Sequence, residues 1–278
     1  MTALTRKKEF KGFLNLLLNL PVLLVILSPL IYTLLISVMP SNEIYKSMLI
    51  PSSINLNNYI KAFTSPAYSF MTLIRNSFIV STAVMLGQML TCSLAAFSFA
   101  FLNFKGRKVL FILVLATMMV PGEATIIANY LTVSRWGWLD SYRVLIIPFL
   151  TSAMGIFLLR QNYLTFAKEL HEAARIDGCS NPRFMASIVV PLSRPALGAL
   201  GAYVFLHTWN QYMWPLLVTN SANFRTVQIG ISMLYDIDAE SLGLMMAGVV
   251  IVIVPSLSIF IFMQKQLING LMAGAVKG

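Results

Sequence analysis

Six long apolar stretches constrain this chain more than any other feature of its sequence. Each stretch is about as long as a helix that crosses the hydrocarbon core of a bilayer, which needs about 20 mainly apolar residues. The composition agrees, because 58% of the residues are hydrophobic and only 11% are charged, whereas soluble domains are about 25% charged. The sequence therefore predicts an all-α, polytopic membrane protein with six transmembrane helices. They are expected near residues 13–38, 74–101, 109–131, 144–163, 196–218 and 243–263.

The same stretches divide the chain into segments. The first is too long for the apolar part of a signal peptide and has no small-residue cleavage site after it, so we expect it to be a retained helix. The predicted segments are a cytoplasmic tail (1–12), the first helix (13–38), an extracytoplasmic loop (39–73), a five-helix core (74–263) with a long inner loop at 164–195, and a cytoplasmic tail (264–278).

The distribution of basic residues predicts which way the chain crosses the membrane. If the N-terminus is cytoplasmic, only six of the 20 Lys and Arg residues lie outside. Cytoplasmic loops favour Lys and Arg, so both termini are expected in the cytoplasm of a bacterial cell, with the chain in its membrane. The net charge of +10 then reflects topology, and no nucleic-acid partner is expected. The six outer residues are Lys46, Lys61, Arg75, Arg135, Arg143 and Arg225.

The inner loop at 164–195 contains the polar segment EAARIDGCSNPRF. Residues 166–177 favour helix by composition, and Gly178 can take the left-handed conformation that ends helices. Ser180 or Asn181 can cap a second short helix. The loop therefore reads as two helices joined at a glycine, with His171 at its surface. Both a docking surface for a partner and an ordinary folded-back loop fit these residues. One apolar face is predicted for Phe166, Leu170, Ala173 and Ala174.

Residues at fixed spacing in this loop resemble the signature loop of ABC importer permeases. They are Glu172-Ala173-Ala174, Gly178, Ile188 and Val190-Pro191, where Val190 stands in place of the family's usual Leu. Four other stretches resemble the carbohydrate branch of that family: FKGR at 104–107, FLLRQ at 157–161, WNQYMWPLL at 209–217 and GAVKG at 274–278. The resemblance covers roughly residues 57–278.

The resemblance implies the transmembrane domain of a type I ABC importer. Such a permease pairs with a second permease, here expected to be a different chain, and with two ATP-binding subunits and an external substrate-binding protein. The chain has no G-x-x-x-x-G-K-[ST] loop to hold phosphates, so it is expected to be no enzyme and to hold no cofactor, with ATP-Mg bound by the partner ATPase. By resemblance, the ATPase-docking residues are Glu172, Ala173, Ala174, Arg175, Asp177 and Gly178.

Polar and aromatic residues in the fifth stretch suggest a substrate pathway. At helical spacing they share one face, and polar groups facing lipid are expensive, so this face is expected toward a cavity or another helix. Amides and aromatic rings suit a sugar, but an aromatic belt with helix–helix hydrogen bonds also fits. The candidates are Tyr203, His207, Asn210, Gln211 and Trp214.

Two further candidates lie in other stretches. Glu123 follows Pro121 and Gly122, which can break the third helix. It is either a pathway residue or a carboxylate tied to the broken turn. Gln88 in the second stretch is a weaker candidate, for which a packing role is favoured. The histidines and cysteines show no metal-ligand spacing, and Cys92 and Cys179 imply no disulfide.

The sequence thus predicts a permease subunit of an ATP-driven, binding-protein-dependent importer of a sugar or oligosaccharide. One alternative is the same machinery importing glycerol 3-phosphate, because WNQYMWPLL is also similar to permeases for that substrate. An alternative of another class is an ion-coupled secondary carrier. Such a carrier should place ion-binding groups near the bilayer midplane, often in inverted repeats, whereas this chain offers only Glu123.

Overall fold

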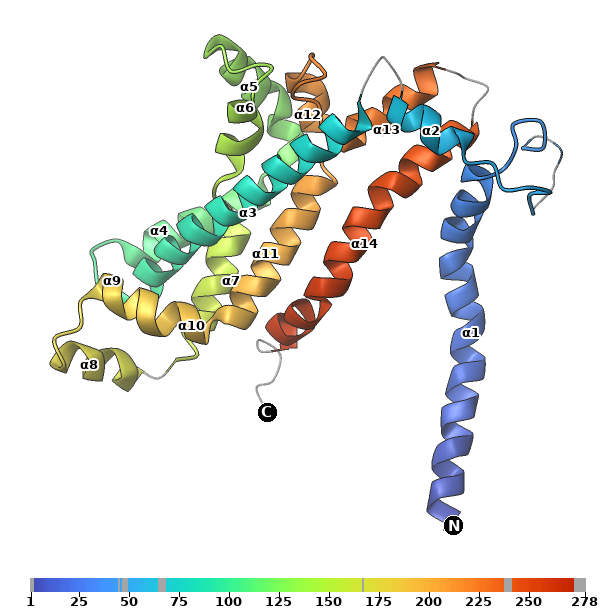
Figure 1. Ribbon diagram of the computed structural model, residues 1–278. Helices are drawn as coiled ribbons and strands as arrows, with labels where there is room; N and C mark the ends of the chain where they lie inside the picture. Colours follow the sequence, from blue (N-terminus) through green and yellow to red (C-terminus); the bar gives the residue numbers. More distant parts are fainter. Residues whose placement is uncertain are drawn as a thin grey trace. The chain divides into compact units, whose positions relative to one another are not determined.

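A computed structural model describes residues 3–44, 46, 50–64, 69–166, 168–237 and 242–272 (Figure 1). All regular structure within these ranges is helical. The chain divides into two compact units. The first comprises Met1–Ala67 and Ile231–Ile253, and the second comprises Tyr68–Gly230 and Val254–Gly278.

The first unit contains α1 (Ala3–Ser37), α2 (Asn57–Thr64), the second part of α13 (Val227–Ile237) and the first part of α14 (Leu242–Met272). The C-terminal end of α1 holds α2 by hydrogen bonds: the Ser37 and Tyr59 hydroxyl oxygens lie 2.7 Å apart, and the Asn58 amide donates to the Ser37 carbonyl at 3.1 Å. The segment at 39–73 is thus no plain loop, since it contains α2 and the first turn of α3.

Helix ends differ from the predicted segments at both termini. The first helix already begins at Ala3, inside the stretch assigned to the N-terminal tail. The last helix runs to Met272, past the predicted end at residue 263. Residues 273–278, which include the whole GAVKG motif, lie outside the described part of the chain.

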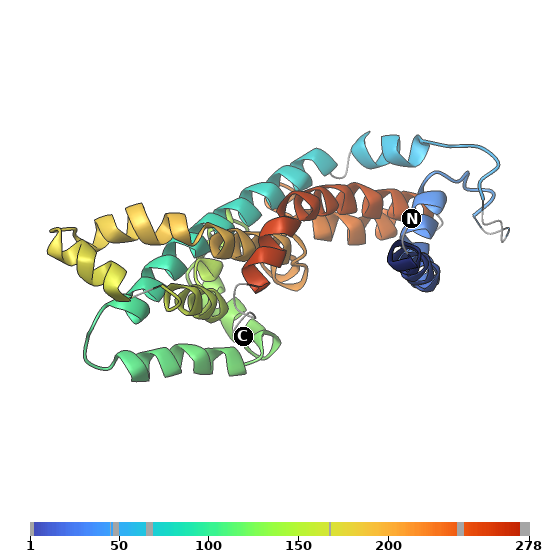
Figure 2. The same ribbon diagram turned by 90° about the horizontal axis from the view of Figure 1, so that it is seen from below.

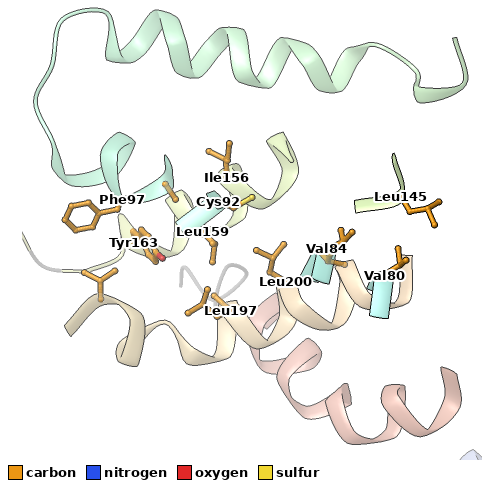
Figure 3. Close-up of a cluster of buried hydrophobic side chains, with 14 of the residues drawn as sticks. Val80, Val84, Cys92, Phe97, Leu145, Ile156, Leu159, Tyr163, Leu197 and Leu200 are labelled. Atoms are coloured by element: carbon orange, nitrogen blue, oxygen red, sulfur yellow. The ribbon is translucent and has the colours of Figure 1, made fainter. Parts of the chain in front are cut away.

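The second unit is built around one long helix, α3 (Phe70–Phe101), which packs along α7 (Ala153–Tyr163) and α11 (Arg194–Trp209). Figure 3 shows their shared core, where Val84 and Cys92 of α3 meet Leu159 of α7 and Leu200 of α11. The other elements are α4 (Arg107–Ala116), η1 (Thr117–Met119), α5 (Gly122–Arg135), α6 (Tyr142–Ile146), η2 (Ile147–Phe149), α8 (Lys168–Ile176), α9 (Asn181–Phe184), the π-helical η3 (Met185–Val189), α10 (Val190–Leu192) and α12 (Met213–Val218).

The six predicted spans correspond to three straight helices and three bent pairs among the described residues. The straight spans are Asn19–Ser37, Phe70–Phe101 and Leu242–Phe262. The bent pairs are Arg107–Met119 with Gly122–Arg135, Tyr142–Phe149 with Ala153–Tyr163, and Asn181–Leu192 with Arg194–Trp209. A count of six is reached when each bent pair is one span.

The third and fourth predicted spans are therefore not single straight helices. The third bends by 98° where η1 meets α5, at Pro121. The fourth bends by 41° between η2 and α7. Proline lacks a backbone N–H and its ring clashes with the preceding turn. Pro121 therefore explains the first break, and Pro148 inside η2 accompanies the second.

The fifth predicted span, 196–218, is also wrong as one helix. Its helix α11 ends at Trp209, and α12 starts only at Met213 after a turn in which the Gln211 N–H donates to the Thr208 carbonyl at 3.2 Å. Pro215 gives the physical reason, because its ring would clash with the carbonyl of residue 211 in a continuous helix. The pathway candidates at 203–214 consequently do not share one helical face.

Candidate functional site

A cavity of about 170 Å³ lies in the second unit, between α3, the η2–α7 break and α11. Among the described residues, none that lines it is Lys, Arg, Asp or Glu. Hydroxyls, amides, one imidazole and aromatic rings make up most of the wall. The lining residues are Gln88, Phe149, Thr151, Ser152, Met154, Tyr203, Val204, His207, Thr208 and Gln211.

The cavity wall at the η2–α7 break is held in place by Gln88 of α3. The side-chain amide of Gln88 donates to the Phe149 carbonyl at 2.8 Å, and its oxygen accepts from the Ser152 hydroxyl at 2.8 Å. The Ser152 oxygen in turn accepts from the Gly155 N–H and caps α7. Gln88 is 8% exposed, so it satisfies backbone groups that the bend leaves without helical partners.

The α11 side of the cavity offers rings and an amide. Tyr203 and His207 lie one turn apart, with ring centroids 5.8 Å apart and planes inclined by 31°. Tyr203 is 50% exposed, and Gln211 is half-buried just beyond the end of the helix. The cavity thus brings Gln88, Tyr203, His207 and Gln211 together.

The other pathway candidates lie elsewhere. Asn210 is exposed, and its oxygen accepts from the Gln228 amide at 3.1 Å. Trp214 is buried in α12 and donates from Nε1 to the Val144 carbonyl at 3.0 Å. Glu123 is exposed in the first turn of α5. Thr151, Ser152 and Thr208 also line the cavity and were not predicted, although Pro148, which precedes Thr151 and Ser152, signals a helix break.

The segment 168–184, which we name the docking elbow, has the two-helix form that its sequence predicts. The first helix, α8, ends at Ile176, and Gly178 follows with a φ of 75°. That left-handed conformation favours glycine, and Pro182 lies in the first turn of α9. Figure 2 shows the elbow, in yellow, beside the end of α3.

The exposed face of the elbow carries most of the docking candidates. Glu172, Ala173, Arg175, Asp177 and Gly178 are exposed, whereas Ala174 is buried and packs into the core of this unit. The predicted apolar face is wrong in part, because Leu170 and Ala173 point outward. Ile176, the last residue of α8, is 86% exposed.

His171 is half-buried: part of its ring is at the surface, as the sequence suggests, and part packs inward. Its ring lies 5.3 Å from the ring of Phe101 and 4.8 Å from that of Phe184, between centroids. Its Nε2 lies 3.3 Å from the Asn181 side-chain oxygen. The imidazole ring of His171 thus packs with two phenylalanine rings. Because Phe101 is distant from His171 in sequence, local spacing could not reveal this contact.

The fold and the site together define an integral membrane transport protein: apolar, bent helices enclose an uncharged polar cavity, and a structured elbow lies at the end of the longest central helix. The comparison with family models makes the class specific. The chain belongs to the binding-protein-dependent transport system inner membrane component family, whose model matches residues 84–266. This membership excludes the alternative of an ion-coupled secondary carrier.

Characterised relatives cover almost the whole chain. It is 35% identical over 258 residues to the sn-glycerol-3-phosphate transport system permease protein UgpE of Agrobacterium fabrum, covering 90% of this chain and 92% of that protein. It is 34% identical over 254 residues to the arabinooligosaccharides transport system permease protein AraQ of Halalkalibacterium halodurans, covering 90% and 91%.

A solved structure shows the same fold. The crystal structure of a bacterial ABC transporter involved in the import of the acidic polysaccharide alginate matches with a TM-score of 0.80, over 94% of this chain and 97% of that chain, at 21% identity. Together with the family match, this likeness confirms the predicted fold of an ABC importer transmembrane domain. The relatives differ in the charge of what their names say they carry, so the cavity of this chain has to guide the choice of substrate.

Proposed function

We propose that this chain is the permease subunit of an ATP-driven importer that passes a neutral sugar or oligosaccharide through the bacterial cytoplasmic membrane. The observation that carries the substrate class is the uncharged lining of the cavity between α3, α7 and α11. Binding sites for small molecules place a few polar groups in a mainly apolar wall. Here Gln88, Thr151 and Gln211 supply hydroxyl and amide groups, and Tyr203 supplies a ring.

An anionic substrate fits this lining less well. Phosphate and carboxylate groups are usually held by Arg or Lys, which form strong charge-assisted hydrogen bonds. Among the described lining residues, His207 is the only side chain with a basic nitrogen. Glycerol 3-phosphate remains the second candidate, because the UgpE relative is 35% identical and almost fully covered.

The energy source and the partners follow from the elbow and the sequence. Without a phosphate-binding loop in this chain, ATP-Mg would be bound and hydrolysed by two separate ATP-binding subunits. We assign the ATPase contact to the exposed elbow residues Glu172, Ala173, Arg175 and Asp177, with Gly178 setting the turn between the helices. Ala174 would act from behind, by seating α8 on this unit.

The remaining partners complete the assembly. A second, different permease would form the pathway with this one, and an extracytoplasmic binding protein would deliver the substrate. The segments expected on the same side of the membrane as the elbow carry the excess of Lys and Arg, which supports cytoplasmic N- and C-termini.

A matched pair of variants tests the role of the cavity. The full assembly with its binding protein is reconstituted in vesicles, and uptake and ATP hydrolysis are measured with a set of neutral oligosaccharides and with glycerol 3-phosphate. A neutral saccharide should stimulate both activities. Gln211→Leu should lower uptake about tenfold, the value of one lost hydrogen bond in the transition state for passage. Asn210→Leu is the control, because Asn210 precedes Gln211 in sequence but does not line the cavity.

Either of two results would overturn the proposal. Stimulation by glycerol 3-phosphate alone would show that the cavity lining does not select neutral substrates. Uptake that continues after the ATPase subunits are removed would show that the energy does not come through the elbow.

A further inference from the structure

We propose that His171 is a positioning residue that fixes the docking elbow to α3, and that α3 carries movement of the elbow to the cavity wall at Gln88. The inference rests on the proposed function, because it takes the ATPase subunits to move the elbow. It adds the route through this chain by which such movement reaches the substrate cavity.

The first step of the route is a cluster of rings at the cytoplasmic end of α3. His171 of α8 contacts Phe101, the last residue of α3, and Phe184 of α9. Phe101 and Phe184 also meet edge to face, with centroids 5.5 Å apart, and Phe184 is 1% exposed. Packed interiors transmit displacement because they have few voids. A shift of α8 therefore has to move the end of α3 or separate these rings.

The elbow itself is rigid enough to move as one piece. The Cys179 N–H donates to the Ala174 carbonyl at 2.8 Å, and the Gly178 N–H donates to Arg175 at 3.1 Å. The contact between His171 Nε2 and the Asn181 side chain joins α8 to the first turn of α9. The angle between the two helices is thus held from both sides of the glycine turn.

The second step is α3, which runs as one α-helix from Phe70 to Phe101 with no proline inside it. From Phe101 back to Gln88 is 13 residues, or about 20 Å along the axis. Sharp kinks in helices arise mainly at proline, at π-bulges or where a group inserts into the hydrogen-bond ladder. This helix behaves as a stiff rod between the elbow and the cavity.

The third step is the set of contacts that α3 makes with the η2–α7 break. Gln88 holds the Phe149 carbonyl and the Ser152 hydroxyl, and Thr91 one turn further donates to the Leu150 carbonyl. At Gly87 an added Cβ would lie 2.3 Å from the Leu150 side chain, so the two segments approach closely. Displacement of α3 consequently displaces Phe149 and Ser152, which line the cavity.

The competing route, along the backbone from the elbow to α11, is less stiff. Between the elbow and α11 lie the π-helical segment η3, Pro191 in α10 and Pro195 at the start of α11. The two helical arms there bend by 79°. A bend with lost and rearranged backbone hydrogen bonds absorbs displacement as a hinge does. The ring cluster therefore offers the stiffer connection to the cavity.

The test follows the cavity wall directly. Met154 lines the cavity and is 42% exposed, so Met154→Cys in a Cys179→Ser background supplies one reactive thiol, while Cys92 is buried. The rate of maleimide labelling is measured on the full assembly without nucleotide and with ATP trapped by vanadate. The two rates should differ, and His171→Ala should reduce their ratio by about 2- to 30-fold, the range of measured coupling energies between sites.

Companion variants separate this role from simple loss of structure. His171→Phe keeps a ring in the cluster and should preserve the ratio. Phe101→Leu should reduce it, and replaces His171→Ala if that variant does not fold and insert into the membrane. Phe104→Ala is the matched control, because Phe104 is a ring near the same end of α3 that packs on Phe99, away from the elbow. Leu94→Gly should soften the exposed side of α3 and reduce the ratio, whereas Leu94→Ala should not.

Three results would overturn the relay. One is a ratio in His171→Ala equal to that of the parent, or a parent ratio of one. Another is loss of the ratio in His171→Phe as well as in His171→Ala. A third is loss of the ATPase subunits from His171→Ala on purification, which would place His171 in the docking surface itself. If the parent assembly never retains ATPase subunits, the proposed function fails instead.

Discussion

The helices α3 and α5 come from similar apolar stretches of sequence but differ in shape and in burial. Both come from apolar stretches that predict membrane spans, yet α3 is straight and buried along one side, while α5 follows a 98° bend and is mostly exposed. In α3, the polar residues Asn76, Ser77 and Gln88 are buried and bonded to other segments. In α5, the polar residues Glu123, Asn129 and Thr132 face outward.

This difference shows what polar residues do in apolar helices. Within a packed bundle they hold helices together by hydrogen bonds, and Asn76, Ser77 and Gln88 tie α3 to its neighbours in this way. A polar stripe left exposed is expensive against lipid, so α5 needs water or another protein beside it. The contrast assigns α3 to the packed part of this unit that joins the elbow to the cavity wall, and α5 to a surface that the pathway or the second permease would cover.

The largest effect is expected at Asn76, which is fully buried. Its amide donates to the Asn223 and Arg225 carbonyls at 2.8 and 3.0 Å, and its oxygen accepts from the Tyr142 hydroxyl at 2.7 Å. Asn76→Leu should cost about 2–4 kcal/mol of unfolding free energy, since it leaves buried polar groups without partners. Thermal unfolding of the purified chain measures this. Asn129→Leu in α5 is the control, and an equal loss in both would erase the contrast.

These buried contacts also mark the limit of sequence reasoning. Helical class, the number of spans and the two-helix elbow follow from hydrophobic length and from glycine and proline. Pro121 even signals the break in the third span. The position of Asn76 against residues 223 and 225, or of His171 against Phe101, depends on chain segments far apart in sequence, and no local pattern encodes it. For the same reason, only part of the cavity lining could be predicted. The sequence indicates Tyr203 and His207 on α11, but not Thr151 and Ser152, which belong to another segment.

A second effect compares two glycines. Gly87 of α3 lies against the Leu150 side chain, whereas an added Cβ at Gly122 of α5 meets nothing within 4 Å. Gly87→Leu should destabilise the chain by about 1–3 kcal/mol through overpacking. Gly122→Leu should leave the unfolding of the isolated chain almost unchanged but weaken its co-purification with the second permease. Normal assembly of Gly122→Leu would remove α5 from the interface.

The smallest effect concerns pH and Asp140, in the loop between α5 and α6. Partial burial would raise the pKa of this carboxyl, but hydrogen bonds from the Ser221 and Asn220 N–H groups, at 2.9 and 3.0 Å, and the charge of Arg225 outweigh it and lower the pKa. A lowered pKa in the folded state means that the stabilisation is complete above the ordinary value of about 3.9 and is lost as pH falls through the folded pKa.

Asp140→Asn should therefore abolish a small loss of stability below about pH 4. Melting temperature is followed from neutral to acidic pH in both proteins. The loss of stability on acidification should be smaller in the variant. Parallel curves for the two proteins would show that the carboxylate does not hold the 219–221 turn.

The account depends most directly on whether the elbow and α3 move as one body. Spin labels at Glu169 and Leu94, both exposed, report the distance between α8 and α3, and labels at Ile127 and Phe157 report that between α5 and α7. Distances are measured by pulsed electron paramagnetic resonance in the full assembly, without nucleotide and after vanadate trapping. We predict an unchanged distance for the first pair and a changed one for the second. A changed elbow–α3 distance with a constant α5–α7 distance would contradict the account.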